Sequence, residues 1–222
     1  MDDARASSPT GTPRAGARIA NSRGAVGTLG CFARTRDARI PVILSCQHVL
    51  FGHGGQSREW WSTTSPLTRA GRVRHGRRGI VRHEGADTYV DCATGEFEPP
   101  LGDARLVPES AGAAPSRHDT VHTVDAAGVT THGTVLATSY SETVLVAGEN
   151  TPATRQILVG TRTPGRPFSQ PGDSGAILRN EQGAAIGLLW GYSASGDALA
   201  CPIAPVLWVL DIELARLAPG AR

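Results

Sequence analysis

The chain has 222 residues, of which 40% are hydrophobic, and its 22 basic and 20 acidic residues give a net charge of +2. This length accommodates one large all-β or α/β domain, or two small ones. The small charge gives no case for a nucleic-acid or membrane-surface protein, and no apolar run approaches the roughly 18 residues that cross a bilayer.

The N-terminal residues 1–17 are small, polar and proline-containing, and they predict a disordered tail. They include no apolar segment of a secretory signal, so a cytoplasmic location is expected. The four cysteines, Cys31, Cys46, Cys92 and Cys201, have apolar or small neighbours and no C-x-x-C spacing. In a reducing compartment we expect buried free thiols, and a bond across neighbouring strands is the alternative.

Short runs rich in Val, Ile, Leu and Thr follow, separated by turn-forming clusters, a pattern typical of β-sandwiches and barrels. The predicted strands are Ala25–Phe32, Arg39–Ser45, Gly79–His83, Thr88–Ala93, Thr120–Val124, Gly133–Ser139, Thr143–Ala147, Gln156–Val159, Gly175–Leu178, Ala184–Leu189 and Ala198–Pro202. One segment, Ile203–Leu217, has helical spacing instead, with apolar residues at 206, 207, 210, 214 and 217. The predicted fold class is therefore all-β, closed by one C-terminal helix.

A segment rich in Pro, Ala and Gly, at 99–120, has little pattern and lies near the middle of the chain. Such a segment is typical of a connection between two similar β units. We therefore expect one domain at 18–222, with a first unit at 18–115, a second at 116–202 and the helix at 203–217.

Three segments carry residues that suit a nucleophile, a general base and an orienting acid. Ser174 lies in Gly-Asp-Ser-Gly, whose glycines permit a sharp bend; a plain hairpin turn is the alternative. His48 follows a strong β run, on a strand end or short turn that holds a base rigidly; a core histidine is the alternative. Asp91 directly follows a β run and is preferred over Asp87 and Asp103 as the acid that fixes the histidine tautomer.

The segments around these residues carry a resemblance to a known family. PGDSGAIL, LSCQHVL and VDCA resemble the nucleophile, base and acid segments of trypsin-like (chymotrypsin-fold) serine peptidases, most of all the bacterial branch without secretion signals. GVTTHGTV at 128–135 and GLLWGYSASGDALACPIAPVL at 187–207 are similar to the strand that opens the second barrel and to the pocket-wall strands. The likeness keeps the His–Asp–Ser chain order of that template and runs from about residue 19 to 214.

The resemblance implies two antiparallel six-stranded β-barrels packed face to face, with the site in the cleft between them. It implies a serine endopeptidase that cleaves a protein or peptide through an acyl-enzyme, with His48, Asp91 and Ser174 as its triad. The backbone N–H groups of Gly172 and Ser174 would form the oxyanion hole. No cofactor and no metal are implied.

The resemblance also places four residues at the substrate pocket: Phe168, Trp190, Gly191 and Asp197. Phe168, six residues before the serine, argues against a preference for Lys or Arg, whereas Asp197 on the return strand would restore acidity. Trp190-Gly191 resembles an edge strand to which a substrate strand pairs.

Departures from the family pattern bear on control. The chain has no I-V-G-G-like segment, so Asp173 needs an Arg or backbone N–H groups as its partner in place of a clipped amine. Asp125 stands where many relatives carry Arg. We expect control by a regulatory protein partner or a ligand. The alternatives are an inactive protease-fold binding module and a small acyl-ester hydrolase.

Two further patterns, a Cys–His cluster and an arginine-rich stretch, have simpler explanations than a binding site. A zinc site would have to gather Cys46, His48 and His53, whose spacing matches no usual ligand set. The arginine-rich stretch at 69–82 suits a solvated hairpin face, with a docking surface as the alternative, and no nucleic acid or membrane is expected as a partner.

Overall fold

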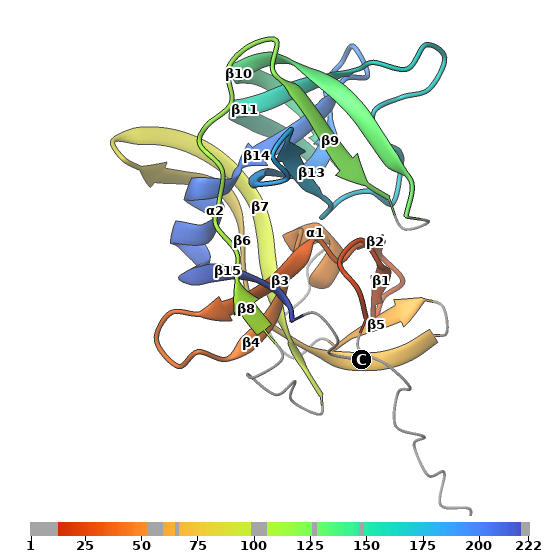
Figure 1. Cartoon of the computed structure of the whole chain (residues 1–222), viewed down its shortest axis with the longest axis vertical. Coiled ribbons are helices and arrows are strands. Elements are labelled where there is room, and N and C mark those ends of the chain that lie inside the picture. The colour runs from red at the N-terminus through yellow and green to blue at the C-terminus, as the bar shows by residue number, and fades with distance from the viewer. Residues whose placement is uncertain are drawn as a thin grey trace, which may run out of the picture.

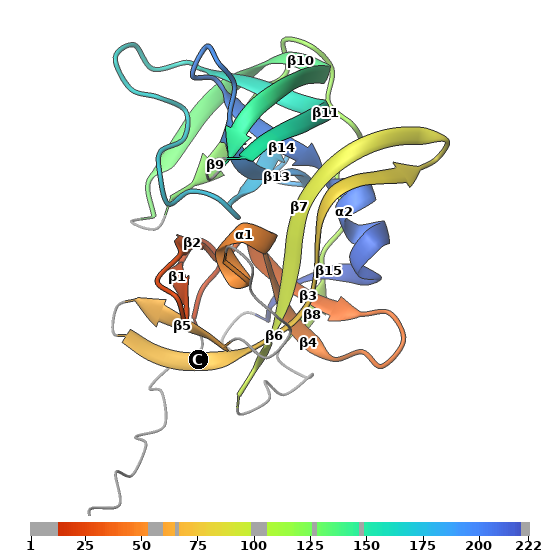
Figure 2. The same cartoon turned by 180° about the vertical axis from the view of Figure 1, so that it is seen from behind.

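The computed structural model describes residues 13–52, 60–64, 67–98, 106–125, 128–146 and 149–218. These residues form two antiparallel β units and two helices, in accord with the predicted all-β class. Figures 1 and 2 show the two units stacked along the long axis, with the short helix α1 (Gln47–Leu50) lying where they meet. No helix in the described ranges is both long and apolar enough to span a membrane.

The first unit is a nine-stranded sheet in the order β2-β1-β5-β6-β7-β4-β3-β15-β8, rather than the six strands expected. Its strands are β1 (Arg18–Asn21), β2 (Val26–Thr28), β3 (Cys31–Thr35), β4 (Pro41–Ser45), β5 (Trp60–Thr64), β6 (Leu67–His83), β7 (Ala86–Phe97), β8 (Leu106–Pro108) and β15 (Ile212–Leu217). The long pair β6–β7 turns through Glu84 and Gly85, both with positive φ, and its tip lies beside the second helix (Figure 1).

The second unit is a closed barrel of six strands in the order β10-β11-β14-β13-β12-β9. These are β9 (Thr120–Val124), β10 (Thr130–Val146), β11 (Glu149–Thr161), β12 (Ile177–Asn180), β13 (Ala185–Tyr192) and β14 (Ala198–Pro202). Ala, Val, Leu and Ile side chains and Phe168 fill the interior of this barrel.

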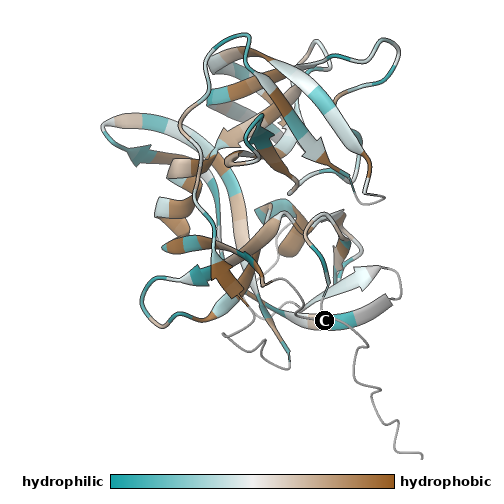
Figure 3. Cartoon of the chain, viewed as in Figure 1, coloured by the Kyte–Doolittle hydropathy of each residue, from teal (hydrophilic) through white to brown (hydrophobic). Residues whose placement is uncertain are grey.

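The main hydrophobic core joins the two units. It combines side chains of the first sheet, such as Ile43 and Val90, with barrel residues such as Leu188 and Trp190. Figure 3 shows the most apolar residues on α1, on the second helix and along the strands beside them. Because this core is continuous, the junction that carries the candidate site is a packed interface.

The prediction of a helix over 203–217 is wrong in its second half. Helix α2 (Ile203–Leu210) ends at Asp211, whose φ of 50° is left-handed, and β15 follows at once. Ile212 and Leu214 are buried at alternate positions and pair with Thr35 and Ala33 of β3. Leu210 and Leu214 have the spacing of a helix, but from Ile212 to Leu214 apolar and polar side chains alternate, as in a strand.

The N-terminal and central limits also need correction. Gly16 N–H donates to Leu29 O and Leu29 N–H to Ala17 O, so residues 16 and 17 pack on the first unit. Residues 1–12 of the predicted tail lie outside the described residues. Ala111 bridges to Ala185 of the barrel, so the connection leaves the first unit before residue 115.

Candidate active site

His48 and Asp91 form a tightly held pair. His48 lies on the one-turn helix α1 directly after β4, in place of the strand end or short turn that was predicted. Its ring Nδ1 is 2.8 Å from Asp91 Oδ2, and its backbone N–H donates to Asp91 Oδ1 at 3.1 Å. Asp91 is fully buried on β7. Both carboxylate oxygens therefore hold the histidine, and they favour the tautomer with the proton on Nδ1.

The alternative acids have other surroundings. Asp87 is exposed near the turn of the β6–β7 hairpin, 3.9 Å from Arg82. Asp103 and His53 lie outside the described residues. Among the carboxylates considered, Asp91 is thus the one that the described structure brings to His48.

The loop before β12 brings Ser174 to the junction of the two units. Ser174 O accepts the Thr28 N–H at 2.8 Å, and Thr28 Oγ1 donates to Gly172 O at 2.8 Å, so β2 of the first unit holds the loop from both sides. Gly175 has a φ of +96°, and a Cβ there would lie 2.2 Å from Ser45 Oγ. Only glycine fits this approach of the loop to the first unit.

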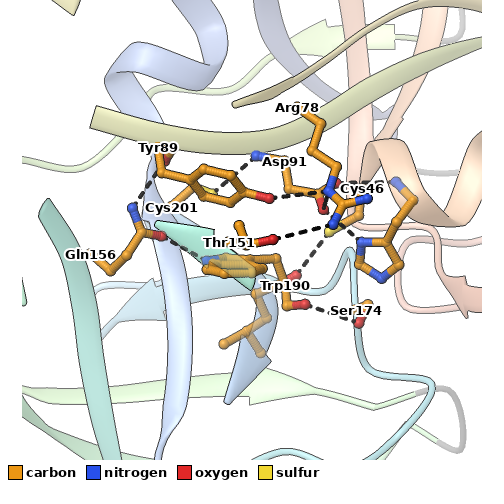
Figure 4. A network of polar contacts seen from close by, with 11 residues as sticks. Cys46, Arg78, Tyr89, Asp91, Thr151, Gln156, Ser174, Trp190 and Cys201 are labelled. Carbon is orange, nitrogen blue, oxygen red and sulfur yellow. Dashed lines mark hydrogen bonds and ion pairs between the residues drawn. The ribbon is translucent and has the colours of Figure 1, made fainter. Parts of the chain in front are cut away.

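The Ser174 hydroxyl points away from the histidine in this state. Its Oγ donates to Trp190 O at 3.4 Å, as Figure 4 shows. No hydrogen bond joins Ser174 to His48 in the described part of the chain. Catalytic hydrogen bonds are often long or misaligned without substrate, and rotation about χ1 moves a serine hydroxyl at small cost.

Two backbone donors beside the serine carry no acceptor in the described structure. The neighbouring N–H groups are used within the fold, because Asp173 N–H bonds Gln170 O and Gly175 N–H bonds Leu189 O. The N–H groups of Gly172 and Ser174 have no such bond within the described ranges. This pattern is that of an anion-binding nest next to the hydroxyl.

Asp173 has local partners among the described residues. Its Oδ2 accepts the Gln170 N–H at 2.7 Å. Burial raises the pKa of this carboxyl, and the Gln170 hydrogen bond and the nearby Arg18 and Arg166 act in the opposite direction. The Arg18 guanidinium lies against this loop, since a Cβ on Gly172 would be 2.9 Å from its Nη2.

Two of the predicted pocket residues are used by the fold. Phe168 is 4% exposed inside the barrel, where a Cβ on Gly133 would lie 2.6 Å from its ring. Asp197 Oδ2 accepts a hydrogen bond of 2.6 Å from Ser195 Oγ in the β13–β14 turn. Both side chains therefore have structural partners of their own.

The other two predicted pocket residues lie on β13 at the site. Trp190 is buried, with Nε1 donating to Gln156 Oε1 at 2.6 Å, and its carbonyl faces Ser174. Gly191 pairs with Leu199 of β14 on one side. On the other side, the pairing with β12 stops at Leu188, so this edge has no described strand partner at Gly191.

Cys46, His48 and Asp91 are the one group of three or more possible metal ligands in the described ranges, with ligand atoms within 4.8 Å of one another. The Cys46 thiol donates to Leu189 O at 3.1 Å, and burial raises its pKa well above the usual value. The His48 nitrogen in this group is already bonded to Asp91, and the Arg78 cation lies 3.8 Å from that carboxylate. Protonated groups and a resident cation suit hydrogen bonding better than a metal.

The arginine-rich stretch on β6 is largely neutralised by neighbouring acids. Arg69 and Arg72 bond Glu98, Arg74 bonds Glu96, and Arg82 lies near Asp87. It is therefore a paired hairpin face. The four cysteines are buried and free, as predicted.

Arg78 belongs to the stretch 69–82 that was predicted to be a solvated hairpin face, but its side chain is only 18% exposed. Arg78 lies opposite Asp91 on the neighbouring strand β6. The detectable signal is the turn at Glu84-Gly85, because a two-residue hairpin fixes the register of its strands.

No protein-family model matches the chain, and no curated protein matches its sequence. Solved structures do match. A glutamic acid specific serine protease superposes with a TM-score of 0.63 at 16% identity, covering 91% of this chain and all of the other. Thermobifida fusca protease A gives a TM-score of 0.60 at 16% identity, covering 92% of this chain and 98% of the other. Nocardiopsis protease gives 0.59 at 16%, covering 90% and 97%.

Similarity at this level of identity extends to the fold. It covers both β units and their packing, which the predicted barrel pair anticipated. The chain therefore has the chymotrypsin-like fold of these serine proteases.

Proposed function

We propose that this chain is a serine endopeptidase that cleaves protein substrates through an acyl-enzyme. The observation that carries the proposal is the fully buried Asp91, which holds the His48 ring at 2.8 Å. The pair lies beside a loop that presents a serine and two backbone N–H groups for which the described residues supply no acceptor. A plain hairpin turn at Ser174 and a core histidine at His48, the two simpler explanations, would not bring these groups together.

The chemistry follows from the positions of the groups. On substrate binding the Ser174 hydroxyl turns from Trp190 O toward the free Nε2 of His48, which takes its proton as Oγ attacks the carbonyl carbon. Asp91 stabilises the imidazolium that results, and the N–H groups of Gly172 and Ser174 receive the oxyanion. The same histidine then gives its proton to the leaving amine, and a water molecule repeats the sequence to release the acyl group.

An extended peptide is the substrate that fits the surroundings. The edge of β13 at Gly191, which has no strand partner among the described residues, offers main-chain groups next to Ser174 for strand addition. Since Phe168 and Asp197 have partners in the fold, we place the specificity of the site in the loops and edge near Gly191 rather than in an acidic pocket floor.

We also propose that a partner protein or ligand controls the site, and that the protein works in the reducing cytoplasm. The Ser174 hydroxyl rests on Trp190 O, so binding that turns it toward His48 would raise activity. Four free cysteines suit a reducing compartment. Once the protein is unfolded, its four thiols are exposed and should form disulfides in a mild oxidant. Gel mobility without reductant, compared between folded and unfolded protein, checks this.

An active-site serine probe tests the proposal. A fluorophosphonate should label wild type and not the Ser174→Ala variant, with a Ser169→Ala variant as the control for a nearby buried serine. A peptide library should then be cleaved by wild type alone. Wild type that stays unlabelled, with and without candidate activators, would refute the catalytic proposal.

The second candidate is a binding module that keeps the fold without activity. It is favoured by one observation, the Ser174 hydroxyl bonded to Trp190 O instead of His48. In that case Ser174→Ala would retain full affinity for peptides that wild type binds without cutting. Turnover of small esters with no peptide cleaved would instead favour an acyl-ester hydrolase.

A further inference from the structure

Arg78 is placed by the β6–β7 ladder directly opposite Asp91. Opposed residues in an antiparallel pair project from the same face. The Arg78 Nε lies 3.8 Å from Asp91 Oδ2, which is also the oxygen bonded to His48 Nδ1, and the arginine side chain is only 18% exposed. A permanent cation and the candidate base therefore share one buried carboxylate oxygen.

The arginine has other contacts that fix its position. Its Nε donates to the Tyr89 hydroxyl at 3.2 Å and its Nη2 to Thr151 Oγ1 at 3.5 Å (Figure 4). Thr151 lies on β11 of the closed barrel, whereas Tyr89 and Asp91 lie on β7 of the first unit. The guanidinium thus links both units at the site.

The other titratable groups near Asp91 stay neutral at working pH. They come from β7, the start of α1 and β14, and are Tyr89, Cys46, Cys92 and Cys201. Burial raises the pKa of each of these groups, with the Asp91 charge adding to the effect. Arg77 on β6 is exposed and donates to Ile80 O. Among the described residues, Arg78 and His48 are the basic side chains in contact with the carboxylate.

We propose that Arg78 is a positioning residue that sets the basicity of His48 through Asp91. The guanidinium fixes the buried carboxylate in place, and it offsets part of the negative charge that stabilises the imidazolium. His48 then stays neutral, and competent as a base, to a lower pH than it would beside an unpaired aspartate. Only the role of the neutral His48 as a general base rests on the proposed function.

The test is the titration of the His48 ring, followed by NMR and assigned with a His48→Gln variant. The distances of 3.8 Å and 2.8 Å place Arg78 Nε and His48 Nδ1 no more than about 6.6 Å apart. Loss of a cation at that range should move the protonation midpoint of His48 upward by about one pH unit in Arg78→Met. The acidic limb of fluorophosphonate labelling should move by the same amount.

Two controls separate charge from structure. Arg78→Lys keeps the cation and should restore the wild-type midpoint, and Arg82→Met removes an exposed arginine of the same strand and should leave it unchanged. If Arg78→Met does not fold, the neutral Arg78→Gln takes its place with the same expected shift. A neutral variant that titrates as wild type overturns the proposal, whatever its thermal stability. The NMR midpoint needs no activity, so it stands even if the protein fails to react with the probe.

Discussion

Replacing Gly175 with alanine tests whether the serine loop depends on close approach to the first unit. The φ of +96° costs an alanine about 1–2 kcal/mol in the left-handed region. The new Cβ would also lie 2.2 Å from Ser45 Oγ and 2.4 Å from Thr28 O, so the loop must move. Overpacking of this kind costs about 1–3 kcal/mol, which gives a total of about 2–5 kcal/mol.

Urea unfolding measures this loss, and Gly196→Ala is the matched control. Gly196 has a φ of +83° with nothing within 4 Å of an added Cβ, so its replacement should cost only the backbone part. Ser45→Ala in the Gly175→Ala background should restore little, because the contact with the Thr28 carbonyl stays. Equal losses of unfolding free energy in Gly175→Ala and Gly196→Ala would refute the packing argument.

Three further outcomes are expected. Asp91→Asn should lower the labelling rate of Ser174 by about 10⁴-fold, because an amide no longer selects the reactive histidine tautomer; a loss under tenfold would contradict the triad. Thr28→Val removes the donor to Gly172 O, and should lower the unfolding free energy by about 0.5–1.5 kcal/mol and slow labelling; unchanged labelling would show that this bond does not place the loop. Burial raises the pKa of all four cysteines, so the unfolded chain loses its thiol protons at a lower pH than the folded chain does. The unfolding free energy should therefore fall above about pH 8.5, which urea midpoints measured at increasing pH would check. This fall should be smaller in Cys92→Ala, which has one buried thiol fewer.

The three residues of the candidate triad could be proposed from the sequence because each one lies in a recognisable local pattern. The glycines around Ser174, the β run before His48 and the β run before Asp91 are all short-range features, and the fold class follows from many such runs. Arg78 has no local signature. Its position opposite Asp91 becomes visible only by counting back along both strands from the turn at Glu84-Gly85.

The errors arose where long-range pairing decides the local structure. Residues 203–217 satisfy helical spacing, but β3 offers a strand edge, and Ile212 and Leu214 pair with it. Phe168 also has a distant partner, Gly133 on β10, and the place of Phe168 and Asp197 at a substrate pocket stays a prediction. The sequence pattern of a single segment does not reveal which distant residues it contacts.

The position of β15 in the first sheet has a consequence for synthesis. This strand lies between β3 and β8, so the sheet that carries Asp91 includes a strand that leaves the ribosome after all the others described. A nascent chain that already contains Ser174 still lacks this strand, and the facing edges of β3 and β8 stay open. The first sheet therefore cannot be completed until translation has passed residue 217.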